Sequence, residues 1–196
     1  MNGLRVIPRD SFAQLPWKNG GGTTYEAIRV PPGGDPFSWR VSLARIDSSG
    51  PFSDFTGYDR KMVLLQGRGL ALRFGNGEHR TLQKAGEWLE FDGGVPVHCD
   101  LLDGPCMDLN LMVSKSMRTA ARIEQLDRNL PVEGVQGQTT LIFSLQDPLL
   151  IDSGDGEAVR LEPWDLAVLS QGSARLNRMA PDKPAASAVF IAAISR

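Results

Sequence analysis

The chain has 196 residues, 41% of them hydrophobic, with 21 Gly, 13 Pro and a formal net charge of -2. The Gly and Pro content is too low for a collagen or a low-complexity chain, and a near-neutral chain without a basic stripe is not typical of nucleic-acid binders. No apolar run reaches the ~18 residues of a membrane span, and the N-terminus lacks a signal-peptide pattern. We therefore expect a cytoplasmic globular protein, and its short segments divided by Gly and Pro predict all-β structure with little helix.

The first notable element is a glycine-rich segment at residues 17–24, WKNGGGTT. Three consecutive glycines allow the backbone to approach a ligand closely, Lys18 and Asn19 supply a charge and an amide, and the backbone N–H groups fit an anion-binding nest. The spacing of a phosphate-binding loop is absent. Two interpretations remain open: a wall of a ligand pocket, or a bend that joins an N-terminal strand to a barrel.

The next element is a strand over residues 37–46, in which apolar and polar side chains alternate. One face is apolar and suits a core, whereas the other carries Arg40 and Ser42. Arg40, with Ser42, fits an anion in a barrel mouth, and the alternatives are an exposed edge or a structural ion pair.

Arg60 stands at the start of a further apolar strand, residues 62–65. Its planar guanidinium offers a fork of donors that suits a carboxylate. The alternative is a salt bridge to Asp54 or Asp59. Asp59 is adjacent in sequence and should therefore point to the opposite face of the strand, which disfavours that pair.

An internal repeat relates the middle of the chain to its C-terminal part at an offset of 79 positions. The matched pairs include Val63 with Ile142, Leu64 with Phe143, Leu70 with Leu149, Leu72 with Ile151, Gly75 with Gly154, and Leu82 with Leu161. Each copy predicts a strand, a Gly-x-Gly turn with Asn-Gly or Asp-Gly, and a second strand. The repeat predicts two small tandem β-barrels or sandwiches, and we place the domains at residues 1–125 and 126–196.

A hairpin turn is predicted at Asp103-Gly104, with Cys99 opposite Asp108 across the two strands. Side-chain alternation then places Asp108 and Asn110 among apolar neighbours on one face. These two residues fit a pocket wall or ordinary hydrogen bonds to loops, and both interpretations remain open. A slip of one residue would exchange the two faces of the hairpin.

The rest of the chain predicts a connection and a last strand. Residues 116–126 carry the best helical pattern, although a short helical turn leading into a strand fits equally well. Residues 129–138 and 181–184 read as loops, and residues 188–194 as the final strand.

The chain has two histidines, His79 and His98, and two cysteines, Cys99 and Cys106. So few His and Cys residues do not suit a tightly bound metal. We therefore expect no metal and no cofactor. His98 is expected to be packed or hydrogen-bonded, and both cysteines to be free, buried thiols.

Several stretches carry a family resemblance. Residues 63–67, VLLQG, and the later Leu82, Glu87 and Gly93 resemble the two sequence blocks of the cupin superfamily. Residues 16–26, 39–46, 50–60 and 108–112, which read PWKNGGGTTYE, WRVSLARI, GPFSDFTGYDR and DLNLM, together resemble the HutD/Ves family. This resemblance implies a bicupin, an association with bacterial histidine utilisation, and a role that limits flux instead of catalysing a pathway step. It also favours the pocket interpretation of Asp108 and Asn110.

The function we expect is non-enzymatic binding of a small anionic metabolite that modulates histidine utilisation. The resemblance points to a carboxylate of the urocanate or formylglutamate class, bound in the N-terminal barrel, with a C-terminal barrel that is mainly structural. The expected ligand-binding residues are Lys18, Asn19, Arg40, Arg60, Asp108 and Asn110, with no catalytic residue.

Other functions remain open. The main alternative is a metal-independent isomerase or hydrolase on a similar metabolite, with Asp108 or Glu26 as general base. A protein-interaction module is a third. Nucleic acid and membrane are not expected as partners, and a homodimer through sheet edges is left open.

Overall fold

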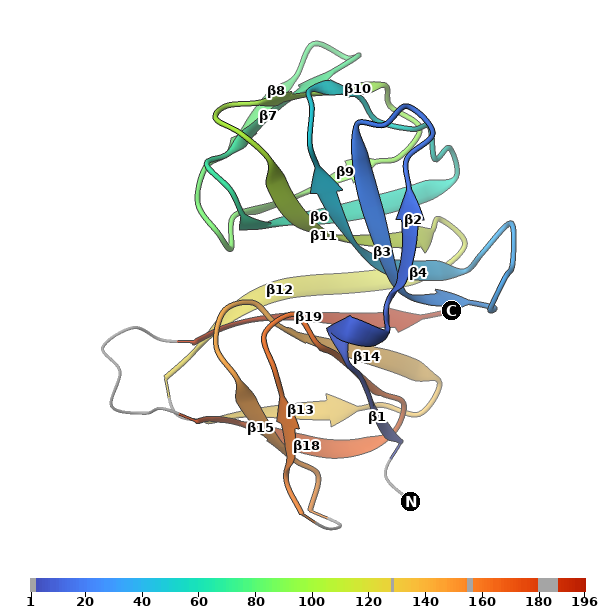
Figure 1. Ribbon diagram of the computed structural model, residues 1–196. Helices are drawn as coiled ribbons and strands as arrows, with labels where there is room; N and C mark the ends of the chain where they lie inside the picture. Colours follow the sequence, from blue (N-terminus) through green and yellow to red (C-terminus); the bar gives the residue numbers. More distant parts are fainter. Residues whose placement is uncertain (1–2, 128, 155–156, 180–186) are drawn as a thin grey trace. The chain divides into compact units, whose positions relative to one another are not determined.

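The structure is a computed structural model that describes residues 3–127, 129–154, 157–179 and 187–196. Within these ranges, regular structure consists of β-strands apart from a 3-10 turn at Arg9–Ser11, so the prediction of an all-β chain is confirmed. The chain divides into two compact units, one formed by Phe12–Ser116 and the other by Met1–Ser11 together with Met117–Arg196 (Figure 1).

The unit over Phe12–Ser116 consists of two antiparallel sheets that share one core. Its six-stranded sheet has the order β2 (Ala13–Pro16), β3 (Gly22–Val30), β4 (Trp39–Ile46), β11 (Cys106–Ser114), β6 (Tyr58–Gln66) and β9 (Trp88–Asp92). Its four-stranded sheet has the order β5 (Gly50–Pro51), β10 (Val97–Leu101), β7 (Leu70–Phe74) and β8 (His79–Leu82). Leu64 and Met62 from the first sheet pack with Leu70, Leu72 and Cys99 from the second, so the inner faces of the two sheets meet.

The other unit is built in the same way. Its five-stranded sheet has the order β1 (Leu4–Ile7), β17 (Leu166–Leu169), β14 (Gln138–Ser144), β19 (Ser187–Ser195) and β12 (Arg118–Leu126). Its four-stranded sheet has the order β13 (Asn129–Gly134), β18 (Gly172–Arg178), β15 (Leu149–Asp152) and β16 (Val159–Leu161). The core between them is aliphatic, with Ile142, Leu149 and Leu176 fully buried.

The strand orders show that the two units are copies of one plan. The order β4-β11-β6-β9 in the first unit recurs as β12-β19-β14-β17 in the second, and β5-β10-β7-β8 recurs as β13-β18-β15-β16. The predicted duplication is therefore present in the topology as well as in the sequence. Part of the second turn of the repeat, Asp155 and Gly156, lies outside the described residues.

The units do not divide where the sequence suggested. Residues 117–125 belong to the second unit, because β12 pairs along its whole length with β19. Residues 4–7 belong there too, since β1 pairs with β17. The expected boundary near residue 125 therefore differs from the observed one, which leaves the first unit at Phe12–Ser116.

Two local predictions need correction. For residues 116–126, the structure agrees with the alternative of a short turn leading into a strand and not with a helix, because residues 118–126 pair with β19. Residues 129–134 form β13 instead of a loop. β10 and β11 are not partners in a hairpin, because the chain crosses from one sheet to the other between them. The final strand is confirmed as Ser187–Ser195, and the loop expected at residues 181–184 lies outside the described residues.

No helix among the described residues has the length and apolar character needed to cross a membrane.

Candidate functional site

The first unit contains a cavity of about 520 Å³ on the inner face of its six-stranded sheet. The strands β4, β6 and β11 form its floor, the loop between β2 and β3 forms one wall, and the segment after β5 forms another. Every residue that the sequence singled out as ligand-binding lines it: Lys18, Asn19, Arg40, Arg60, Asp108 and Asn110.

Strand register explains how side chains distant in sequence reach one cavity. On β11, Asp108, Asn110 and Met112 alternate with the buried residues of the opposite face and so share the inner face. Met112 stands between Arg40 on β4 and Arg60 on β6 in one cross-strand row. The predicted face of β11 is thus correct although its predicted strand partner is not, since the side-chain period is the same whichever strand lies beside it.

Arg60 is a buried cation for which no hydrogen-bond acceptor is found among the residues the structure describes. Its residue exposure is 5%, and its Nε is buried without a partner. Three phenyl rings surround it, with its Cζ 5.3 Å from the centroid of Phe52, 5.4 Å from Phe55 and 4.9 Å from Phe91. Burial lowers the pKa of Arg60 to about 10, against the opposing effect of Asp108. The guanidinium therefore keeps its charge at neutral pH and lacks a counter-ion in contact with it.

Asp108 and Asn110 give the same cavity two acceptors. They are 2% and 5% exposed. Burial raises the pKa of Asp108 to about 7, although the positive charge of Arg60 acts in the other direction. In the described part of the chain, the buried Oδ1 of Asn110 has no donor. A buried acceptor without a donor costs free energy, so these groups favour a ligand that brings one.

Arg40 has an ion-pair partner and also lines the cavity. Its Nη1 lies 3.8 Å from Oε2 of Glu26, so a structural ion pair exists. Glu26 is bound more closely by Arg29, whose Nη2 donates to Oε2 at 2.8 Å. Arg40 also lines the cavity, and its buried Nε lacks a partner in the residues described. Burial lowers the pKa of Arg40, while Glu26 raises it.

The glycine-rich segment is a hairpin loop and a cavity wall at once. Trp17 N–H donates to Gly22 O, and Gly20, at φ 71°, closes a turn by donating to Trp17 O. The Gly21 N–H donates to Asn19 Oδ1. These N–H groups are therefore engaged within the loop and do not form the anion-binding nest that the sequence suggested. Lys18 stands at the exposed tip of the loop.

Gly22 shows why this segment needs a residue without a side chain. A Cβ at this position would lie 2.3 Å from the carbonyl oxygen of Arg45 and 3.1 Å from the ring of Trp17. Trp17 is also fixed by a hydrogen bond from its Nε1 to Thr24 Oγ1 at 2.9 Å. The glycine thus lets the indole lie against β3 and line the cavity.

The phenylalanines around Arg60 are the part of the site that residue-by-residue reasoning missed. Phe52 and Phe55 lie in an irregular segment, where no period assigns a face, and Phe91 lies directly opposite Arg60 on the neighbouring strand β9. The only signal for them was that Phe52 and Phe55 belong to a motif of the family resemblance. Met112 was placed on the correct face but not assigned to the site.

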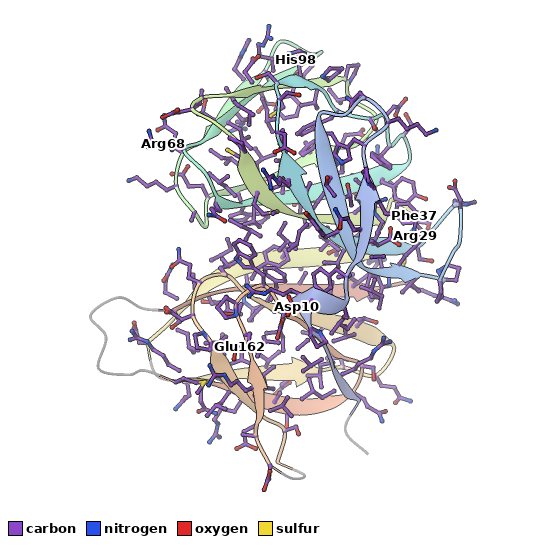
Figure 2. All side chains as sticks on the ribbon, in the orientation of Figure 1. Asp10, Arg29, Phe37, Arg68, His98 and Glu162 are labelled. Carbon is purple, nitrogen blue, oxygen red and sulfur yellow. The ribbon has the colours of Figure 1, made fainter. Side chains whose placement is uncertain are left out.

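The cavity does not suit a divalent metal. Its described lining holds one carboxylate, Asp108, beside two guanidinium groups, and it includes no histidine or cysteine. Such a donor set cannot supply the several nitrogen, sulfur or oxygen ligands that a tightly bound divalent metal requires. His98 lies on the four-stranded sheet, where its Nε2 is 3.4 Å from Asp100 Oδ1, and Figure 2 shows it at the end of this unit away from Arg29 and Phe37.

The predicted state of the cysteines is confirmed. Cys99 and Cys106 are both free and buried. Burial raises the pKa of Cys99 to about 12, with Asp108 adding to the effect, so its thiol stays neutral.

The second unit has a threonine and two aliphatic residues at the positions that match Arg60, Asp108 and Asn110. The Gly86 N–H donates to Leu64 O in the first unit, and the Trp164 N–H donates to Ser144 O in the second, which aligns the two registers. These two hydrogen bonds make Leu64 equivalent to Ser144. Counting along the paired strands from there, Arg60 corresponds to Thr140, Asp108 to Val189 and Asn110 to Ile191. The polar cluster is therefore a feature of the first copy.

The fold and the site together define a cupin-type β-protein with two tandem units and a polar cavity in the first. The chain belongs to the HutD family, whose family model matches residues 9–186. It is 34% identical over 166 residues to an uncharacterized 21.2 kDa protein in the hutC 3' region of Pseudomonas putida, covering 84% of this chain and 86% of that one.

Two solved structures resemble it over nearly their whole length. A conserved protein of unknown function from Pseudomonas aeruginosa PAO1 is 32% identical with a TM-score of 0.86, covering 98% of this chain and 99% of that chain. HutD from Pseudomonas fluorescens SBW25 is 29% identical with a TM-score of 0.78, covering 98% of each. The predicted family is thereby confirmed.

Proposed function

We propose that the protein is a non-enzymatic binder of a small carboxylate and that it modulates histidine utilisation. The observation that carries the proposal is Arg60, a nine-tenths buried guanidinium that lines a cavity with no acceptor on it among the described residues. A buried charge is costly unless it is paired, and a guanidinium fork matches the two oxygens of a carboxylate. A ligand carboxylate would supply the missing counter-ion.

The size and polarity of the cavity support a metabolite. A volume of about 520 Å³ lies in the range of small-molecule sites, which are roughly 300–1,000 Å³. Trp17 and Phe55 offer apolar walls, and Asn110 Oδ1 and Asp108 offer acceptors for a donor at the other end of the ligand. Urocanate carries an imidazole N–H and one carboxylate, and formylglutamate carries an amide N–H and two carboxylates, so either class fits this arrangement.

The link to histidine utilisation rests on relatives. One lies in the hutC 3' region of its genome, and one solved relative carries the name HutD. We extend that association to this chain as part of the proposal, together with a role in limiting flux.

One observation favours an enzymatic alternative. A carboxyl group whose pKa lies near 7 is suited to act as a general acid or base, and Asp108 is such a group. Glu26, the other residue considered as a base, is held by Arg29. An isomerase or hydrolase acting through Asp108 is therefore the second candidate, and turnover decides between the two.

The test is calorimetric titration of the protein with urocanate and with N-formyl-L-glutamate. We expect one of them to bind, and Arg60→Gln to weaken binding roughly hundredfold or more, because the ligand's charge then lacks its partner in a desolvated site. Arg68→Gln is the matched control, since its side chain is 77% exposed and lies at the surface (Figure 2).

Two results would overturn the proposal. One is equal affinity of the Arg60→Gln and Arg68→Gln variants for the bound carboxylate. The other is sustained turnover of either compound that disappears in Asp108→Asn, which would establish the enzymatic alternative.

A further inference from the structure

Asp108 and Arg60 share the cavity as two buried groups that do not touch. Both line it, and both are at least nine-tenths buried. Among the described residues neither an ion pair nor a hydrogen bond joins them, yet each shifts the pKa of the other. Arg60 therefore stabilises the ionised form of Asp108 through space, within the cavity that both residues line.

Among the charged groups around Asp108, Arg60 is the one that mainly stabilises its ionised carboxylate. Arg60 faces the cavity from β6, and Arg40 faces it from β4, where Glu26 of β3 lies 3.8 Å from Arg40 and offsets its charge. Lys18 reaches the cavity from the exposed loop between β2 and β3. From β10 the neighbour is Cys99, a neutral thiol.

We infer that binding of a carboxylate at Arg60 is accompanied by uptake of one proton at Asp108, so that the site binds its ligand and a proton together. The inference rests on the proposed function, because it requires an anion at Arg60. When the ligand neutralises the guanidinium, the carboxylate of Asp108 loses its support and gains a second negative charge beside it. Desolvation then prevails, and the group takes up a proton from the solvent.

The sign of the pH dependence follows from the same exchange. At pH 6 Asp108 is already largely protonated in the free protein, because burial raises its pKa to about 7. Binding then takes up little, and affinity is nearly flat below this pH. Above pH 7 the free carboxyl is ionised and binding must protonate it, so affinity falls as pH rises. Arg60, with a pKa of about 10, keeps its charge over this range.

The experiment is calorimetry of the full chain with N-formyl-L-glutamate, which has no group titrating between pH 6 and pH 9. At pH 7.5, heats measured in phosphate and in Tris give the number of protons taken up. We expect roughly half a proton or more per ligand, and an affinity that falls roughly fivefold to tenfold between pH 7 and pH 8.5. If this compound does not bind, urocanate is used in the same way, with its own imidazole titration subtracted.

The decisive variant is Asp108→Asn, which imitates the protonated carboxyl. It should bind without proton uptake and with an affinity nearly independent of pH, and at pH 8.5 it should bind more tightly than the native protein. Asp10→Asn is the matched control, because its side chain is 93% exposed, and it should retain the proton uptake.

Each outcome decides the inference. Arg60-dependent binding with no proton uptake would overturn it and leave the proposed function standing. Proton uptake that persists unchanged in Asp108→Asn would also overturn it. Absence of binding for both compounds would contradict the proposed function and the inference with it.

Discussion

Arg60 and Asp108 are charged side chains that the fold buries in one cavity without a hydrogen bond between them. The sequence could place them there in part. Alternation along the strand separated Asp108 and Asn110 from their neighbours, and the guanidinium of Arg60 stood at the start of an apolar strand. What could not be predicted is how deeply Arg60 is buried. Phe52 and Phe55 lie in an irregular segment, and Phe91 contacts Arg60 only because β9 pairs with β6.

Asp108 should make the protein less stable at high pH. Its pKa of about 7 in the folded protein lies above the usual value near 3.9 that it regains on unfolding. A carboxyl shifted in this direction favours the folded state fully only below its unfolded pKa, and that contribution is lost as pH rises through the folded pKa. Asp108→Asn removes the penalty, and we expect it to raise the free energy of unfolding by about 2–4 kcal/mol at pH 8.

Urea unfolding at two pH values measures this effect. At pH 4 the native protein and Asp108→Asn should differ far less than at pH 8. An equal difference at both pH values would mean that Asp108 is not a buried, ionising group in the folded state.

At the scale of elements, the hairpin β2–β3 shows what a glycine pattern can and cannot predict. The three glycines correctly predicted a tight loop beside the cavity, but they did not show why each position needs a glycine. Gly20 provides a positive φ, whereas Gly22 provides room for Trp17. Only the pairing of β3 with β4 distinguishes these roles, since it sets which atoms lie opposite Gly22.

Gly22→Ala should therefore damage both the fold and the site. The added methyl meets Arg45 O at 2.3 Å and the Trp17 ring, and we expect a loss of about 1–3 kcal/mol in stability with weaker carboxylate binding. Gly50→Ala is the control, because a Cβ there meets no atom of the described residues within 4 Å. Thermal unfolding and calorimetry report the two effects, and equal behaviour of the two variants would contradict this role of Gly22.

The Asp103-Gly104 turn illustrates a limit of local signals. Gly104 does adopt a positive φ of 75°, as a tight turn requires. However, β10 and β11 leave the turn into different sheets, with β10 beside β7 and β11 beside β4 and β6. Local chemistry specified the bend, and long-range pairing decided the partners.

At the scale of the whole molecule, the repeat predicted two similar β-units, but not that the first strand of the chain belongs to the second unit. A tandem β-unit was visible in matched leucines and glycines, and the strand orders repeat. The first strand, β1, pairs with β17 of the second unit, far away in sequence, and no local pattern announces that partner. The sequence offset of 79 is also one residue too short for β6 and β14, because their strand pairings align Met62 with Ile142.

The second unit should not bind the ligand. Val189 and Ile191 stand where the first unit has Asp108 and Asn110, and both are buried in its aliphatic core. We expect one carboxylate per chain in a calorimetric titration. Thr140→Ala, at the position matching Arg60, should leave affinity and stoichiometry unchanged. A stoichiometry of two, or loss of binding in Thr140→Ala, would show that the duplicated unit also binds.

The most direct test of the central claim is a crystal structure of the protein with whichever of urocanate and N-formyl-L-glutamate binds in solution. The expected result is one ligand in the cavity of the first unit, with both carboxylate oxygens about 3 Å from the guanidinium nitrogens of Arg60. A ligand whose carboxylate lies elsewhere, with the Arg60 guanidinium still unpaired, would contradict the assignment of this cavity as a carboxylate-binding site.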